Sequence, residues 1–399
     1  MKSLFKFLQI ISGLVIAIAI RIVLPFRNYK FGRLPSHEIG HYASNVEIHL
    51  CEKDAKIHGD SKKTADIWYR NPDHAVANNQ LDTMWSRVIK ISNSPITRYA
   101  DAISQRLPGG SKFSISHHDR DAYGLYSKLQ PHIKFSNSET KQGEDFLNSL
   151  RATTSQKFVC LAVRDSSYKR DQFENRDIRH DDYRNNDINN FHNVAKRLVS
   201  DGYLVFRMGA KVERPFGVDA SGVFDYASNG MRTDFLDVYL SANCEIFIST
   251  VLGIDSIPEI FRVPRVLTNY IPIANFGKYG PQDLIIPKQY WIENENRYMP
   301  FSEIVASKNA LGSCTSSYEY QRAGLKLVEN TPQDITLAAQ ELLARKNGTW
   351  QVTVEAKTLQ DKFWSLYDQL SPPGIKSRVD DHKPIIGTEF LRANPHWTL

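Results

Sequence analysis

The sequence predicts an α/β protein with two Rossmann-like lobes, preceded by an N-terminal hydrophobic anchor helix. Apolar runs of strand length alternate with segments of helical spacing, which is typical of parallel sheets. The 399 residues suit two domains, and residues 4–26 are almost entirely apolar. We therefore expect a membrane anchor at 1–27, a first lobe at 28–150, a second lobe at 151–330, and C-terminal helices and a tail at 331–399 that pack back on the lobes.

The composition indicates a globular protein, because 41% of the residues are hydrophobic and 24% are charged. The formal charge of +6 fits either an evenly basic surface or an anionic partner such as phospholipid or a phosphorylated substrate. No dense basic run or nucleic-acid reader motif is present, so we expect no nucleic-acid partner. The four cysteines are widely spaced, which favours buried free thiols in a reducing compartment over disulfides or a zinc ribbon.

The N-terminal apolar segment reads as an uncleaved membrane anchor. Its uninterrupted core, 10–20, resembles the apolar region of a signal peptide, but apolar sequence continues through Leu24. Arg21 can extend its charge towards water, so the segment either spans the membrane or lies in its interface. Positive charges after the core outnumber those before it, which places the large domain at the cytoplasmic face of a bacterial inner membrane: Arg21, Arg27, Lys30 and Arg33 against Lys2 and Lys6.

The elements of the first lobe follow in order. Strands are expected at 29–35 and 66–70, and a helix at 78–91. Apolar residues at helical spacing, Ile39, Tyr42, Val46 and Leu50, predict another helix between the strands. Residues 92–156 give no clear order of elements.

The second lobe shows a clearer alternation. Strands are expected at 157–164, 203–209, 222–227, 245–250 and 264–269, with helices at 188–198 and 232–244. Two more helices are expected at about 331–347 and 353–370. This order predicts a doubly wound sheet, whose functional loops follow the carboxyl ends of the strands.

Arginines, aspartates and small residues gather at those strand ends. A guanidinium group matches phosphate oxygens with two parallel hydrogen bonds, and a turn of small residues before a helix adds backbone N–H donors. Each residue alone also fits a structural ion pair or a helix cap. Together they predict a diphosphate-binding site made of Arg164, Asp165, Arg207, Asp225, Arg232, Asp234, Ser249, Thr250, Gly253 and Ser256.

Motifs for other cofactor chemistry are missing from the sequence. It contains no phosphate-binding GxxxxGK[ST] loop, no kinase signature set and no dinucleotide-binding GxGxxG. It also lacks an isolated Asp-x-Asp after a strand, the arrangement that would hold a nucleotide-bound metal. We therefore expect neither a cofactor nor a metal at the donor site.

Residues 37–41, "HEIGH", match the His-Glu-x-x-His motif of zinc peptidases. With Ser36 as the N-cap, both histidines would share one helix face. In one class of zinc peptidases the motif continues with a glycine and a third histidine that also binds the metal. Here Ser44 and Glu47 occupy those two positions, so a zinc protease is a remote alternative. The histidines fit better as a general base, most plausibly His41, or as structural groups at a helix start.

A run from residue 163 to residue 272 resembles a family of bacterial glycosyltransferases of lipopolysaccharide and surface-polysaccharide gene clusters. The matching segments include "VRDSSY", "LVSDGYLVFRMG" and "FLDVYLSANCEIFISTVLGIDSIPEIF", with "FGRLPSHEIGHYASNVEIHLCEKD" near the N-terminus and "IPKQYWIENENRYMPFSEI" later in the second lobe. The "VRDSSY" motif is distantly similar to the His-x-Arg motif of fucosyltransferases, although Ala162 replaces the histidine. The resemblance covers about residues 30–310 and is looser at 92–156.

The resemblance implies a GT-B-like fold and transfer of a sugar from a nucleotide-sugar donor without an obligatory metal. By this resemblance Arg164 contacts the donor diphosphate, and the acceptor is a cell-surface glycan, a lipid-linked precursor or a lipopolysaccharide precursor. His41 and Arg164 are then the expected catalytic residues, and Arg33 and His37 lie on the acceptor side. A non-catalytic sugar- or lipid-binding protein on the same fold is the alternative.

Overall fold

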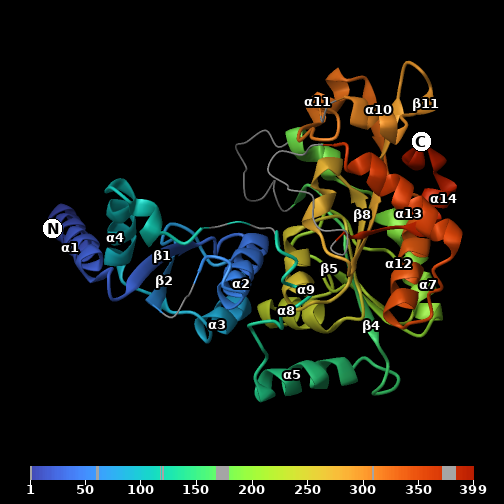
Figure 1. The fold of residues 1–399 in the computed structure, drawn as a ribbon. Helices are drawn as coiled ribbons and strands as arrows, with labels where there is room; N and C mark the ends of the chain where they lie inside the picture. Colours follow the sequence, from blue (N-terminus) through green and yellow to red (C-terminus); the bar gives the residue numbers. More distant parts are fainter. Residues whose placement is uncertain are drawn as a thin grey trace. The chain divides into compact units, whose positions relative to one another are not determined.

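The computed structural model describes residues 2–59, 63–116, 118, 121–167, 179–307, 310–370 and 383–399. The chain forms two compact units, the first made of Met1–Arg120 and Leu129–Asn137, the second of Asp121–Lys128 and Ser138–Leu399. Each unit contains a parallel sheet with helices (Figure 1), and an apolar helix begins the chain. The predicted α/β class is therefore confirmed.

The first unit is built on a three-stranded parallel sheet in the order β1-β2-β3. Phe31 of β1 pairs with Ile67 of β2, and the core includes Phe31, Tyr69 and Phe113. The predicted strands and the helix between them are present, but the helix predicted at 78–91 ends at Ser86, and Ile91 belongs to a third strand. The elements are α1 (Lys2–Val23), β1 (Asn28–Leu34), α2 (Ile39–Asp54), β2 (Thr64–Arg70), α3 (Asn79–Ser86), β3 (Ile91–Ser92), α4 (Pro95–Arg106) and the 3₁₀ helix η2 (Gly110–Phe113).

The start of α2 differs from the prediction. Glu38 is the N-cap, and it caps without a side-chain hydrogen bond. Ser36, the expected cap, is buried before the helix, where its carbonyl oxygen accepts a hydrogen bond from the Ala77 N–H at 2.8 Å. This backbone contact holds Ser36 in the connection from β1, so His37 also precedes the helix. The expected pair of helical histidines on one face is therefore wrong.

The second unit is built on a seven-stranded sheet in the order β13-β9-β8-β7-β4-β5-β6, with every pair parallel. Strands added outwards from β4 in both directions give the predicted doubly wound order, so the switch point lies between β4 and β7. The strands are β4 (Phe158–Ala162), β5 (Leu204–Met208), β6 (Val223–Phe224), β7 (Phe247–Ser249), β8 (Arg265–Tyr270), β9 (Asp283–Pro287) and β13 (Ile385–Ile386).

Helices and a small second sheet surround the seven-stranded sheet. The second sheet is antiparallel and consists of β11 (Arg297–Tyr298), β10 (Gln289–Ile292) and β12 (Leu325–Val328). The helices are α5 (Asn137–Asn148), η3 (Arg179–Arg184), η4 (Ile188–Phe191), α7 (His192–Ser200), α8 (Asp234–Asn243), η5 (Gly253–Asp255), α9 (Ser256–Ile260), η6 (Ile273–Lys278), α10 (Phe301–Ala306), α11 (Ser317–Arg322), α12 (Pro332–Lys346), α13 (Val354–Tyr367), α14 (Thr388–Ala393) and η8 (Pro395–Thr398).

The C-terminal helices pack on the second unit. Helix α12 lies beside α7 (Figure 1), and its Ile335 and Ala339 join the same buried core as Phe363 of α13. Thr331 and Asp334 form a reciprocal capping box that fixes the start of α12. This part of the chain therefore belongs to the fold of the second unit and is not a loose tail.

Residues 138–150, expected in the first lobe, fold with the second unit through α5. The Tyr239 hydroxyl of α8 donates to Glu144 Oε1 at 3.2 Å, and the ring of Phe146 packs at 6.3 Å from that of Phe206. The four cysteines are buried and free, as predicted.

Candidate anion-binding site

The carboxyl ends of β4 and β7 meet at the switch point of the second unit's sheet. The Arg164 backbone N–H, two residues after β4, donates to Thr250 Oγ1 at 2.7 Å. Thr250 directly follows β7 and is buried. In doubly wound sheets the ligand lies outside the strands at this point. The predicted residues Arg164 and Thr250 are thus brought together where a ligand is expected.

Arg164 is a buried cation with unused hydrogen-bonding capacity. Its side chain is 11% exposed, and Asp181 Oδ2 lies 3.9 Å from its Nη2. Its Nε is buried and makes no hydrogen bond within the part of the chain that the structure describes. Burial, together with the nearby positive charge of Arg184, lowers the pKa of Arg164 to about 10, so the group stays protonated at neutral pH. A bound anion would supply the missing acceptor.

Two further cations surround Arg164, and neither was identified from the sequence. Arg184 Nη2 donates to the Val251 carbonyl oxygen at 3.0 Å. Lys288 is 4% exposed and donates from Nζ to the Asn185 carbonyl oxygen at 2.7 Å. Burial lowers the pKa of Lys288 to about 8, with the Arg164 charge acting in the same direction. We call Arg164, Arg184 and Lys288 the cation cluster.

Acidic groups near the cation cluster are mostly engaged elsewhere. Glu329 raises the pKa of Lys288, but its oxygens accept hydrogen bonds from the Asp187 N–H and from Asn190 Nδ2. Asp181 Oδ2 lies 3.9 Å from Arg164 Nη2. One buried lysine and two partly buried arginines thus lie at this edge of the sheet, which makes it suitable for an anionic ligand.

The turn after β7 is held by its own side chains. Ser249 Oγ donates to Asp255 Oδ2 at 2.7 Å and accepts from the Val251 N–H at 3.1 Å, while the Leu252 N–H also donates to Asp255. Val251 has a φ of 64°, a strained backbone for a β-branched residue. Ser249 therefore shapes the turn, and Gly253 and Ser256 begin the short helices η5 and α9 behind it.

Arg207 in β5 and Asp225 directly after β6 form a separate ion pair, although Arg207 Nε is buried and makes no hydrogen bond among the described residues. Arg207 is 1% exposed, and its Nη1 donates to Asp225 Oδ1 at 3.1 Å. Asp225 Oδ2 accepts from the Phe216 N–H at 2.9 Å. The pair fixes the loop between the two strands, where Asp225 and Phe216 also line a surface hollow of about 280 Å³ with Gly217, Val218, Asp219 and Val223.

The remaining predicted donor-site residues also have protein partners. Asp165 accepts hydrogen bonds from the Ser167 and Glu213 backbone N–H groups at 2.9 and 2.8 Å. Arg232 Nη2 lies 2.7 Å from Asp237 Oδ2 and 3.9 Å from Asp234 Oδ1. These contacts position the loops around the sheet edge.

The predicted acceptor-side residues lie in the first unit, at or after the end of β1. His41 Nε2 is 3.3 Å from Glu38 Oε2, and its side chain is 48% exposed. His37 stacks on His74, with the ring centroids 4.5 Å apart. Arg33 is exposed on β1. A His41–Glu38 pair can take up a proton, because the carboxylate stabilises the imidazolium.

Comparison with known proteins finds distantly similar solved structures and no matching sequence family. No protein-family model matches the chain, and no curated protein matches it. Among solved structures, the ADP-heptose lipopolysaccharide heptosyltransferase II of E. coli is 11% identical with a TM-score of 0.41, over 80% of this chain and 99% of that one. A family 9 glycosyl transferase from Veillonella parvula is 10% identical with a TM-score of 0.44, over 80% and 98% of the chains. E. coli heptosyltransferase WaaC, with ADP-2-deoxy-2-fluoro heptose, is 11% identical with a TM-score of 0.32, over 64% and 92% of the chains. The structural neighbours of this chain thus include glycosyltransferases, at identities that do not assign it to their family.

Proposed function

We propose that the protein is a glycosyltransferase that moves a sugar from a nucleotide-sugar donor to a cell-surface glycan or a lipid-linked acceptor. The observation that carries the proposal is the cation cluster at the switch point of a doubly wound sheet. Such sheets bind nucleotides at this point, and a buried lysine with two partly buried arginines suits a diphosphate. The proposal rests on this geometry and not on the distant neighbours.

The proposed chemistry needs a base and a group that accepts negative charge. The acceptor hydroxyl attacks the anomeric carbon and loses its proton, while the bond from that carbon to the diphosphate oxygen breaks and its electron pair leaves with the diphosphate. Arg164, Arg184 and Lys288 would stabilise the charge on the departing group. Their positive charges can supply this stabilisation without a metal. For the proton of the acceptor we propose His41 of the first unit, which is paired with Glu38, and we propose Arg33 and His37 as further acceptor-side residues of that unit.

Binding and turnover of nucleotide sugars test the proposal. We expect at least one nucleoside diphosphate to raise the melting temperature of the full-length protein, because a ligand at 100 times its Kd stabilises a protein by about 2.7 kcal/mol. The matching nucleotide sugar should then release that diphosphate when acceptor is present. Saturable binding without release would favour a non-catalytic binding protein, and no binding of any diphosphate would refute the donor site.

We also propose that α1 lies in the plane of the cytoplasmic membrane surface and does not span the bilayer. Among the described residues, α1 is the one helix long and apolar enough to cross a membrane. One of its faces is packed on α4 (Figure 1): a Cβ at Gly13 would lie 2.7 Å from Tyr99 Cβ. Arg21 donates to the Ser104 carbonyl oxygen at 2.8 Å and its guanidinium lies over the Phe113 ring.

These contacts argue against a transmembrane orientation. Helix α4 carries Asp101, Gln105 and Arg106, which would enter the hydrocarbon together with α1 at a high cost. The opposite face of α1 is free to enter the lipid interface, since it exposes Leu4, Phe7, Leu8, Ile11, Leu14, Val15, Ile18 and Ile22. A helix in this position would keep the protein near a lipid-linked acceptor.

A further inference from the structure

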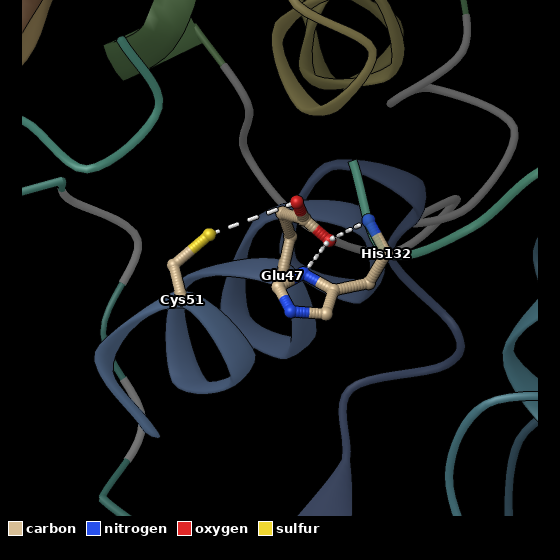
Figure 2. A group of neighbouring side chains, drawn as sticks. All are labelled: Glu47, Cys51 and His132. Carbon is tan, nitrogen blue, oxygen red and sulfur yellow. Dashed lines mark hydrogen bonds and ion pairs between the residues drawn. The ribbon is translucent and has the colours of Figure 1, made fainter. Parts of the chain in front are cut away.

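We propose that Glu47, Cys51 and His132 form a binding site for a zinc-like divalent metal ion in the first unit. Glu47 and Cys51 lie one turn apart on α2, and both are fully buried. His132 comes from the returning segment 129–137 of the same unit. The three side chains point towards one another (Figure 2), and their ligand atoms all lie within 4.8 Å of each other.

Two of the distances between the ligand atoms are close to the edges of a tetrahedral metal site, although they end on the two different oxygens of Glu47. His132 Nδ1 is 3.2 Å from Glu47 Oε2, and Cys51 Sγ is 3.7 Å from Glu47 Oε1. Metal–ligand bonds of about 2.3 Å to sulfur and about 2.0 Å to nitrogen and oxygen imply edges of roughly 3.3 Å for N–O and 3.5 Å for S–O. Small rotations of the three side chains would therefore accommodate a cation. Thiolate, imidazole and carboxylate are also the ligand types that zinc prefers.

A carboxylate behind His132 orients the ring for metal binding. His132 Nε2 lies 3.1 Å from Asp54 Oδ2. An N–H at Nε2 that donates to Asp54 leaves the lone pair of Nδ1 free for a metal, the arrangement that metal-bound histidines usually have. The protein supplies three ligands, and a water molecule would be the fourth ligand of a tetrahedral ion.

The charges of the ligand groups balance a divalent ion. A Cys51 thiolate and a Glu47 carboxylate carry two negative charges together, and a neutral His132 completes the set. The metal-bound cluster would therefore be neutral, so burial does not oppose it.

The proposed ion has a structural role that is independent of sugar transfer. It would join the segment around His132 to α2 and fix the return of the chain to the first unit. The residues differ from the "HEIGH" motif, whose His37 and His41 take no part.

Cobalt substitution tests the site directly. The full-length protein is stripped with a chelator and titrated with Co²⁺, while zinc content is measured by elemental analysis after reconstitution. We expect one equivalent of metal and a near-ultraviolet charge-transfer band from thiolate to cobalt. Cys51→Ser should abolish this band, whereas Cys314→Ser, at a buried free thiol of the second unit, should leave it unchanged.

Further variants keep the test decisive. Asp54→Asn should weaken metal binding about 10- to 100-fold while circular dichroism stays unchanged, because it removes the group that orients His132. If Cys51→Ser does not fold, His132→Gln replaces it, and the same loss of binding is expected. Failure of the wild type to bind one equivalent of metal, or an undiminished thiolate band in a folded Cys51→Ser variant, would overturn the site and leave an ion pair only.

Discussion

Replacing Lys288 with methionine should stabilise the protein and weaken binding of a nucleoside diphosphate. Lys288 is 4% exposed, and burial lowers its pKa from 10.5 to about 8. The folded protein therefore holds the ammonium group at an energetic cost at neutral pH. Methionine keeps a similar side-chain length without the charge. Binding of an anionic ligand to the ammonium group would offset this energetic cost.

The size of the effect follows from the pKa. The difference between 10.5 and about 8 corresponds to about 3 kcal/mol of destabilisation at pH 7. Loss of the 2.7 Å hydrogen bond to the Asn185 carbonyl oxygen costs about 1 kcal/mol. Lys288→Met should thus gain about 2 kcal/mol, which corresponds to a rise in melting temperature of about 4–8 °C. Diphosphate affinity should fall at least tenfold, because a charge-assisted hydrogen bond is lost.

Thermal denaturation and calorimetric titration with nucleoside diphosphates check both effects. Between pH 8 and 10.5 the unfolded wild type binds more protons than the folded one at this residue, so its stability should rise with pH, and Lys288→Met should lack that rise. Lys326→Met, at an exposed lysine of β12, is the matched control and should change neither property. A Lys288→Met variant that is less stable than the wild type and binds diphosphate normally would refute the reasoning.

Three other outcomes are expected. Asp283→Ala should destabilise the protein by about 3–5 kcal/mol in urea denaturation, since it takes from the buried Arg265 the carboxylate that accepts two of its hydrogen bonds and leaves Glu259 as its one acidic partner among the described residues; a loss below 1 kcal/mol would contradict this. His41→Gln should lower kcat about 100-fold or more at unchanged diphosphate affinity, and an unchanged kcat would exclude His41 as the base. Ile18→Glu should release the protein from anionic phospholipid vesicles in sedimentation assays, whereas Val352→Glu, also an exposed apolar position, should not; retention of Ile18→Glu would contradict the proposed orientation of α1.

The architecture of the second unit was predictable because its central strands are buried on both faces. Such strands are continuous apolar runs, as at 158–162 and 204–208, and are recognised without knowledge of tertiary contacts. Strand β9 was not predicted from the sequence, although 284–286 is also apolar. Lys288, which directly follows this strand, was therefore not recognised as a residue at a strand end. Arg184 was overlooked because it lies in a strongly polar segment that resembles a solvated loop.

The roles of individual site residues were harder to predict than their positions. Arg207 lies at a strand end, as a phosphate-binding arginine would, but its guanidinium group forms an ion pair with Asp225. Likewise, Ser36 has the side chain of a helix cap, yet a backbone contact with Ala77 decides where α2 begins. In both cases the deciding partner is distant in sequence, so local spacing cannot reveal it. The Glu47–Cys51–His132 cluster was missed for the same reason.

The turnover of Arg164→Ala tests the proposed transferase site most directly. Arg164 Nε is buried without a hydrogen-bond partner among the described residues, and its side chain lies at the switch point. We predict that the variant keeps the melting temperature of a control, Arg197→Ala on the exposed face of α7, and loses about 100- to 1,000-fold in kcat for release of nucleoside diphosphate from the sugar donor. A folded Arg164→Ala protein with nearly normal kcat would contradict the account.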